Sequence, residues 1–187
     1  MAGKHAALGV LLSAIVLLAA SSTGLLDAVS WWVQAVGGAG GDQAWGATAM
    51  EEGFAVAGHT YSFGVGGWDL LVCRFNSNGS LLWAKTIGGP GNEEAWGGAS
   101  TLGEGIAVVG WTESFGAGGR DFLVCKLGED GSLEWAKAIG GVGDEYPGST
   151  SAIGSELIVA GTTESFGAGG RDFLVCKLGE DGSLEWA

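Results

Sequence analysis

Basic residues, proline and histidine are scarce in this chain, and each scarcity excludes a class of protein. Its 187 residues include 8 Lys and Arg against 21 Asp and Glu, a net charge of -13. No cluster of basic side chains is therefore present to bind the phosphates of a nucleic acid. Only 2 prolines accompany 38 glycines, which excludes collagen, and 47% of the residues are hydrophobic, which excludes intrinsic disorder.

The two histidines, His5 and His59, are too few to indicate nucleophilic catalysis. A nucleophile needs an adjacent base, and no other histidine follows His59. The neighbours Glu93 and Glu94 would point to opposite faces of a strand, so they do not form the facing carboxylate pair of a glycosidase. We predict that the chain is not an enzyme.

An uncharged run at residues 6–20 follows the positive charge of Lys4 and precedes small residues. This order is typical of a secretory signal peptide, which we expect within residues 1–30. Residues 6–26 are also long enough to be an uncleaved membrane anchor, since a transmembrane helix needs about 20 residues. Both interpretations predict export, so residues 31–187 are expected outside the cell or at its surface.

The rest of the chain repeats one unit. The run Trp-Ala-Lys-x-Ile-Gly-Gly, or a close variant of it, occurs at residues 32–38, 83–89 and 135–141. The repeats are 51 or 52 residues long and span 32–82, 83–134 and 135–185, with a fourth starting at Trp186. Residues 112–136 and 163–187 are identical over 25 positions. Internal repeats of this length are typical of propellers and solenoids.

Each repeat contains four short runs with the composition of β-strands. In the second repeat they are residues 95–102, 106–113, 121–127 and 132–139. Turn residues separate them, and pairs such as Asp130-Gly131 close tight hairpins. This repeat is one residue longer than the others, and we expect the extra residue in a hairpin turn between Trp96 and Thr112. No helical period of apolar residues follows residue 30, so the fold is predicted to be all-β.

Both faces of the expected strands are apolar, which indicates sheets covered on both sides. In residues 121–127, Leu123, Cys125 and Leu127 lie on one face, while Phe122 and Val124 lie on the other. Repeated four-stranded antiparallel sheets of about 50 residues, each packed between neighbours, predict β-propeller blades. Glycines within strands suit the crowded region near a propeller axis. A β-solenoid is the alternative, although its coils are usually shorter.

The motifs also resemble a known group of proteins. Trp-Ala-Lys-Thr-Ile-Gly-Gly, Asp-Phe-Leu-Val-Cys-Lys-Leu and Asp-Gly-Ser-Leu-Glu-Trp are similar to the short β-propeller repeats of bacterial and archaeal surface proteins. The resemblance covers residues 31–187. It implies a propeller fold and an exported location, and it implies no reaction.

Three blades do not close a ring, since propellers have about 4–8. One explanation is that the chain is a fragment of a longer propeller. The other is that two or more chains complete a ring by self-association, with the strand at residues 30–36 of one chain pairing into a blade of another. Both explanations leave open blade edges on the isolated chain.

Acidic residues recur after the Gly-Gly turns, and four of them are candidate calcium ligands: Asp42, Glu93, Asp144 and Glu145. Calcium takes about 6–8 oxygen ligands, but the spacing here matches no twelve-residue calcium loop. We therefore favour a solvated acidic loop and keep calcium as the alternative. No other cofactor or metal is predicted.

Other residues recur because the scaffold needs them. The cysteines Cys73, Cys125 and Cys176 are expected to be free, small buried residues. The aspartates that begin the third strand of each repeat are expected to accept hydrogen bonds from nearby backbone N–H groups: Asp69, Asp121 and Asp172. The repeated tryptophans are expected in the core: Trp32, Trp83, Trp135 and Trp186.

Positions where the repeats differ are the candidates for partner contact, because a scaffold requirement would make them alike. His59 aligns with Trp111 and Thr162, Tyr61 with glutamates, and Trp68 with arginines. We expect His59, Tyr61, Trp68 and Trp111 to contact a protein or a carbohydrate.

The leading hypothesis is a non-enzymatic scaffold or recognition module at the cell surface. The alternative is a fragment of an exported hydrolase or lyase that acts on polysaccharide.

Overall fold

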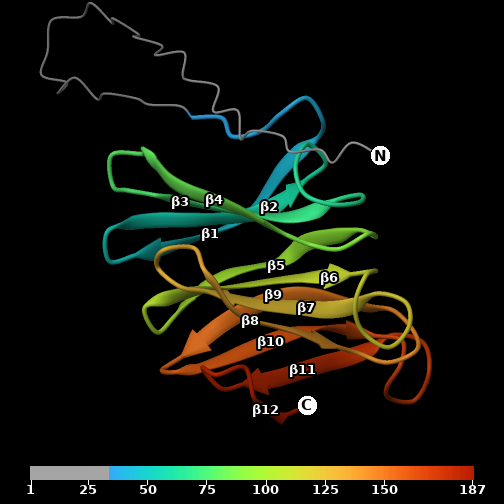
Figure 1. Ribbon diagram of the computed structural model, residues 1–187. Coiled ribbons are helices and arrows are strands. Elements are labelled where there is room, and N and C mark those ends of the chain that lie inside the picture. The colour runs from blue at the N-terminus through green and yellow to red at the C-terminus, as the bar shows by residue number, and fades with distance from the viewer. Residues whose placement is uncertain (1–33) are drawn as a thin grey trace, which may run out of the picture.

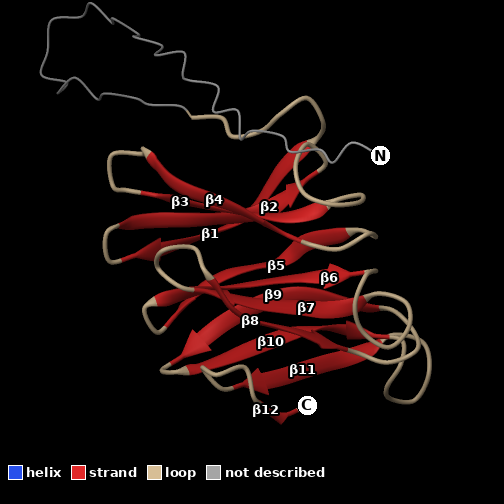
Figure 2. Ribbon diagram, in the orientation of Figure 1, coloured by secondary structure: helices blue, strands red, loops and turns tan. Residues whose placement is uncertain are grey.

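The structure, a computed structural model, describes residues 34–187, and all regular elements in this range are β-strands (Figure 2). The all-β prediction is confirmed for this part of the chain. The signal peptide or anchor predicted at residues 1–30 lies outside the described residues. Between residues 34 and 187, no helix is long and apolar enough to cross a membrane.

Twelve strands form three antiparallel sheets of four strands, each in chain order. The first sheet contains β1 (Asp42–Met50), β2 (Gly53–Thr60), β3 (Asp69–Phe75) and β4 (Leu81–Ile87). The second contains β5 (Glu93–Leu102), β6 (Gly105–Thr112), β7 (Asp121–Leu127) and β8 (Leu133–Ile139). The third contains β9 (Glu145–Ile153), β10 (Glu156–Thr163), β11 (Asp172–Leu178) and β12 (Leu184–Trp186).

The sheets follow one another in space as they do in the sequence (Figure 1). They are consistent with three propeller blades that do not close a ring, and they are called blades 1, 2 and 3 below. The four expected strands of the second repeat are all present, with ends shifted by one or two residues. Each blade ends with the strand that begins a sequence repeat, so Trp83 lies in β4.

The extra residue of the second repeat lies within a strand and not in a hairpin turn, so that expectation was wrong. In β1 the register shifts between Ala44 and Gly46, which leaves Trp45 as a bulged residue. In β5 the register shifts between Glu94 and Gly98, which makes that bulge one residue wider. Bulges redirect the side chains they carry, and both of these carry a tryptophan.

Apolar residues form one cluster between blades 1 and 2 and another between blades 2 and 3. In the second cluster, Phe122 and Val124 of β7 pack with Leu157, Val159 and Cys176 of blade 3. All seven residues of β7 are buried. This explains why both faces of the strand are apolar: one face belongs to each of the two blade interfaces.

Glycines let the first strands of neighbouring blades approach closely. Strand β5 packs against both β1 and β9. A Cβ atom on Gly46 of β1 would lie 2.8 Å from the Cα atom of Gly98 in β5, a distance that side chains do not tolerate. Glycine therefore permits the close approach of β1 and β5 at this contact, and its expected place near a propeller axis stays a prediction.

The repeated tryptophans connect each blade to the next one. Trp83 donates a hydrogen bond from its indole nitrogen to the carbonyl oxygen of Glu129 in blade 2, at 2.8 Å. Its ring covers Gly131, whose φ of +78° and missing Cβ permit this contact. Trp135 repeats the bond to Glu180 in blade 3. Trp83 and Trp135 are half-buried and pack against the apolar clusters of these interfaces, whereas Trp186 is exposed, so the expectation of a core position was wrong for Trp186. Trp32 lies outside the described residues.

Candidate functional site

The two bulges place Trp45 and Trp96 against each other on the molecular surface. Their rings are stacked, with centroids 4.8 Å apart and planes inclined by 17°. Trp45 is 48% exposed and Trp96 is 50% exposed. The Trp96 indole nitrogen donates a hydrogen bond of 2.8 Å to a carboxylate oxygen of Glu94. Large exposed aromatic rings with a fixed orientation are a feature of binding surfaces.

His59 lies beneath this pair and is buried. Its Nε2 atom is 3.5 Å from the Trp45 indole nitrogen, which donates to it. Burial lowers the pKa of His59, against the opposing effect of Glu94, so the imidazole is neutral and able to accept this bond. Its Nδ1 atom is buried without a partner in the described part of the chain.

Trp68 and Tyr61 continue the aromatic contacts along the edge of blade 1. The Trp68 ring meets His59 edge-on at 4.7 Å between centroids. Tyr61 meets Trp68 at 5.5 Å. The exposed or half-buried residues Trp45, Trp96, Tyr61 and Trp68 are called the aromatic surface below.

Blade 2 carries an arginine where blade 1 has Trp68. The Arg120 guanidinium lies 4.2 Å from the centre of the Trp111 ring and covers it, a cation–π contact. It also forms an ion pair with Glu113 at 3.0 Å and donates to the Tyr146 hydroxyl at 3.2 Å. Trp111 is therefore buried beneath a charged group.

Asp144 completes a polar hollow between blades 2 and 3. It accepts hydrogen bonds from the Arg120 backbone N–H and the Tyr146 hydroxyl, and these bonds lower the pKa of Asp144. The hydrogen bond from Asn92 is the largest cause that lowers the pKa of Glu113. The hollow has a volume of about 390 Å³ and is lined by Glu113, Arg120, Asp144 and Tyr146.

The structure places the four predicted contact residues at this end of blades 1 and 2. Tyr61 is exposed and Trp68 is half-buried, whereas His59 and Trp111 are 3% exposed. His59 is covered by aromatic neighbours such as Trp68, and Trp111 is covered by Arg120. The role of the four residues in partner contact stays a prediction.

Trp45 and Trp96 were missed because they occupy equivalent positions in two repeats. Residues that repeat are expected to serve the scaffold, and blade 3 has no tryptophan in β9. The sequence did contain an indication of their position, because a glycine follows each tryptophan in the middle of a strand: Trp45-Gly46 and Trp96-Gly97. A glycine within a strand often marks a bulge.

The expectation of a solvated acidic loop was wrong for Glu93 and Glu145. Both are fully buried at the start of the first strand of a blade. Glu93 accepts hydrogen bonds from the Thr112 hydroxyl and the Gly89 N–H, both at 2.7 Å. Glu145 makes the same bonds with Thr163 and Gly141.

Asp42 holds the equivalent place in blade 1 and bonds the hydroxyls of Thr60 and Ser62. These carboxylates are acceptors within the blades. Among residues 34–187, no group of three or more His, Cys, Asp or Glu side chains is arranged to hold a metal ion. The calcium alternative for Asp42, Glu93, Asp144 and Glu145 gains no support from this arrangement.

Each buried glutamate faces an aspartate of the preceding blade. A Cβ atom on Gly140 would lie 2.1 Å from Asp121 Oδ1 and 2.1 Å from Glu145 Oε2, so these two oxygens are at most about 4.2 Å apart. Asp69 and Glu93 converge on Gly88 in the same way. Burial is the main cause that raises the pKa of Asp121, and it raises the pKa of Asp69 to about 6.

The other oxygen of each aspartate accepts the backbone bonds that the sequence predicts. Val65 donates to Asp69 at 2.9 Å, Ala117 to Asp121 at 3.0 Å, and Ala168 to Asp172 at 3.0 Å. Asp121 Oδ1, which faces Glu145, has no hydrogen-bond partner in the described region. A proton on Asp121 Oδ1 would let this atom donate a hydrogen bond to Glu145 and so gain a partner.

The three cysteines are free and buried, as predicted. Burial raises the pKa of Cys73 and Cys125 to about 12 and that of Cys176 to about 11. Since the thiolate is the reactive form, we expect Cys125 to resist alkylation by iodoacetamide in the folded protein at pH 8. Mass spectrometry of the alkylated chain, with and without urea, measures this. Rapid alkylation of Cys125 without urea would contradict it.

Two segments of the chain are similar to a known family. Residues 55–81 and 156–185 match the family described as a domain of unknown function (DUF5122) beta-propeller. The first segment covers β2, β3 and the turn into β4, and the second covers β10, β11 and most of β12. No curated protein matches the chain significantly. The family match and the three four-stranded sheets together support a β-propeller repeat protein.

Proposed function

We propose that this chain is a non-enzymatic recognition module that is exported to the cell surface and binds carbohydrate. The stacked, half-exposed pair of Trp45 and Trp96 is the observation that carries the proposal. Sugar rings present C–H groups that pack on indole faces, and their hydroxyls need hydrogen-bond partners nearby. Glu94 supplies an acceptor beside Trp96, and His59 holds Trp45 in place.

The neighbouring polar hollow suits the same ligand class. Arg120, Glu113 and Asp144 present a donor and two acceptors beside the tyrosine hydroxyl of Tyr146. Their orientation is set by the hydrogen bonds among them and not by a ligand. Aromatic platforms that lie beside such fixed polar groups provide affinity from stacking and specificity from hydrogen bonds.

No arrangement among residues 34–187 favours the hydrolase or lyase alternative, which stays a prediction. The converging carboxyl pairs that could suggest acid–base chemistry, Asp69 with Glu93 and Asp121 with Glu145, are buried between blades. Incubation with polysaccharides followed by a reducing-end assay tests the alternative. Release of reducing ends above the level of a boiled sample would contradict the non-enzymatic proposal.

Substitution of the tryptophans tests the binding site. We expect Trp45→Ala and Trp96→Ala each to weaken binding of a cell-surface polysaccharide at least ten-fold, a loss of about 1.4 kcal/mol, because each removes one half of the platform. Isothermal titration against a panel of glycans measures the affinity. Leu82→Ala is the control, since Leu82 is 55% exposed but lies at the start of β4, away from the aromatic surface.

The outcomes distinguish carbohydrate from other partners. Binding that is lost in both tryptophan variants and kept in Leu82→Ala supports the site. A panel in which no glycan binds, or a glycan that binds all three variants equally, would overturn it. Export is tested separately, by locating the native protein in the medium, the envelope or the cytoplasm of fractionated source cells.

A further inference from the structure

Two identical stretches of sequence have different surroundings in this fold. Residues 112–136 of blade 2 and 163–187 of blade 3 are the same over 25 positions. Phe122 of blade 2 is fully buried against blade 3, whereas the equivalent Phe173 is 90% exposed. Val124 is buried and the equivalent Val175 is exposed. The surface of blade 3 that begins with Phe173 is therefore built to be covered by another blade.

Ile153, Phe173, Val175 and Trp186 form this exposed surface, which is called the C-terminal face below. The equivalent residues of blade 2 show which contacts such a surface makes when another blade covers it. Leu102, Phe122 and Val124 pack with apolar residues of the next blade. Trp135 donates its indole N–H to a carbonyl oxygen of the next blade.

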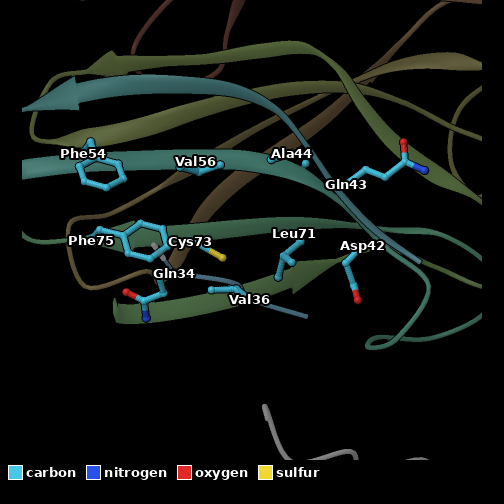
Figure 3. A pocket seen from close by; sticks show the side chains of 11 residues that line it. Gln34, Val36, Asp42, Gln43, Ala44, Phe54, Val56, Leu71, Cys73 and Phe75 are labelled. Atoms are coloured by element: carbon cyan, nitrogen blue, oxygen red, sulfur yellow. The ribbon is translucent and has the colours of Figure 1, made fainter. Parts of the chain in front are cut away.

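Blade 1 carries the complementary surface. The equivalent surface of blade 3 packs against the preceding blade, blade 2. It consists of Phe54, Val56, Leu71, Cys73 and Phe75 and is called the N-terminal face below (Figure 3). Within one chain Phe54 and Val56 are half-buried, and Leu71, Cys73 and Phe75 are buried. In blade 3, the equivalents of these five residues pack against the C-terminal side of blade 2. The N-terminal face surrounds a cavity of about 270 Å³, with Gln34 and Val36 also in its lining.

Strand β12 of blade 3 is shorter than the fourth strands of blades 1 and 2. Strand β8 pairs with β7 along its length, from Phe122↔Ile139 to Leu127↔Leu133. Strand β12 pairs with β11 only near Lys177 and Leu178. An open hollow of about 720 Å³ lies beside the unpaired stretch and is lined by Phe173, Leu174 and Val175.

Residues 34–36 align with the second half of the fourth strands of blades 1 and 2. In the repeats, Gln34-Ala35-Val36 aligns with residues 85–87 and 137–139, which pair with the third strand of a blade. Val36 already packs against the N-terminal face of blade 1. Ile87 and Ile139 pack against the following blade in the same manner.

We propose that the C-terminal face of one chain binds the N-terminal face of a second copy, and that residues 34–36 of the second copy pair with the open edge of β11. Each half of the contact repeats an interface that already exists between blades of one chain. The contact is head-to-tail, so it occurs twice in a closed dimer. Two copies bring six blades, within the range of about 4–8 in which propellers close.

Polar groups on the two faces also correspond. Asp172 is equivalent to Asp69 and Asp121, which face Glu93 and Glu145 of the next blade. Asp42 holds the position of those glutamates in blade 1, so it meets Asp172 of the other copy. The Trp186 indole is expected to donate to the Ser77 carbonyl oxygen, which corresponds to the acceptors of Trp83 and Trp135.

The mass of the full chain in solution tests the proposal. Sedimentation in a mild non-ionic detergent should give a particle of twice the 18.8 kDa of one chain at micromolar concentration. Phe173→Glu should weaken the dimer at least hundred-fold, because it buries an unpaired charge at both contacts. Since Phe173 is 90% exposed in one chain, the circular dichroism of the monomer should not change.

Val142→Glu is the matched control. Val142 is apolar and 86% exposed although it lies beside the formed interface of blades 2 and 3, so its substitution should leave the dimer unchanged. Val56→Glu disables the N-terminal face instead. A mixture of Phe173→Glu and Val56→Glu chains retains one intact contact and should form mixed dimers.

Three results would overturn the proposal. One is a wild-type chain that stays monomeric up to 100 μM. Another is a dimer that Phe173→Glu and Val142→Glu leave equally intact. The third is a native protein, recovered from source cells, that is monomeric and heavier than this chain by multiples of about one repeat.

Discussion

Raising the pH from about 4.5 to about 8 should destabilise the folded chain. The cause is the pair of buried carboxyl groups at each blade interface. Burial, with a further contribution from Glu93, raises the pKa of Asp69 from 3.8 to about 6, and the pKa of Asp121 is raised for the same reasons, with Glu145 as its neighbour. The folded state therefore holds protons that the unfolded chain releases at a lower pH.

The sign of the effect follows from linkage between protonation and folding. A group whose pKa is raised by folding contributes its full stabilisation below its unfolded pKa, here 3.8, and loses it as the pH rises through about 6. A shift of about 2 units corresponds to roughly 3 kcal/mol of unfolding free energy for Asp69. Carboxyl groups with lowered pKa values, such as Glu113 and Asp144, act in the opposite direction at more acidic pH.

Urea unfolding at a series of pH values measures this dependence. Asp69→Asn imitates the protonated carboxyl, so it should raise the free energy of unfolding at pH 8 and flatten the pH profile. Asp172→Asn is the control, because Asp172 faces no following blade within one chain. These measurements are made at a protein concentration low enough for the chain to be monomeric. A profile that rises from pH 4.5 to 8 would show that the carboxyl pairs do not share a proton.

Truncation of Phe122 should produce the largest loss of stability. Its side chain is fully buried between blades 2 and 3, among Leu102, Leu157 and Leu174. Phe122→Ala should lower the free energy of unfolding by about 3–5 kcal/mol, because it removes buried apolar surface and leaves a cavity.

The repeat supplies an unusually close control for this change. Phe173→Ala alters the same residue in the same 25-residue sequence. Since Phe173 is exposed in one chain, it should change the stability of the monomer by less than about 0.5 kcal/mol. Thermal unfolding of both variants at low concentration makes the comparison. Equal losses in the two variants would mean that Phe173 is buried within one chain.

Much of the fold was predictable because it depends on local features that recur. Four strands were predicted in each repeat from turn residues such as Asp130-Gly131 and from the short apolar runs between the turns. The structure contains these strands. Apolar residues on both faces of residues 121–127 indicated sheets packed on both sides. The buried cysteines and the capping role of Asp69 followed from the same recurrence.

The candidate site was less predictable. Tyr61 and Trp68 were predicted as contact residues because they differ between repeats, and that role stays a prediction. Trp45 and Trp96 were missed because they occupy equivalent positions in two repeats. The bulges that carry them depend on how two strands pair, which the sequence does not show directly. Glu93 was expected in a solvated loop, but a hydroxyl from the end of the neighbouring strand and a backbone N–H four residues earlier make its burial possible.

The sequence by itself determined the β-strands, their grouping in fours and the equivalence of the repeats, because hydrophobic alternation and turn chemistry are local. Only the tertiary structure decided which equivalent residues are covered. Phe122 and Phe173 have the same neighbours in sequence and opposite exposure. Burial depends on whether another blade follows in space, and the sequence around a residue does not contain that information.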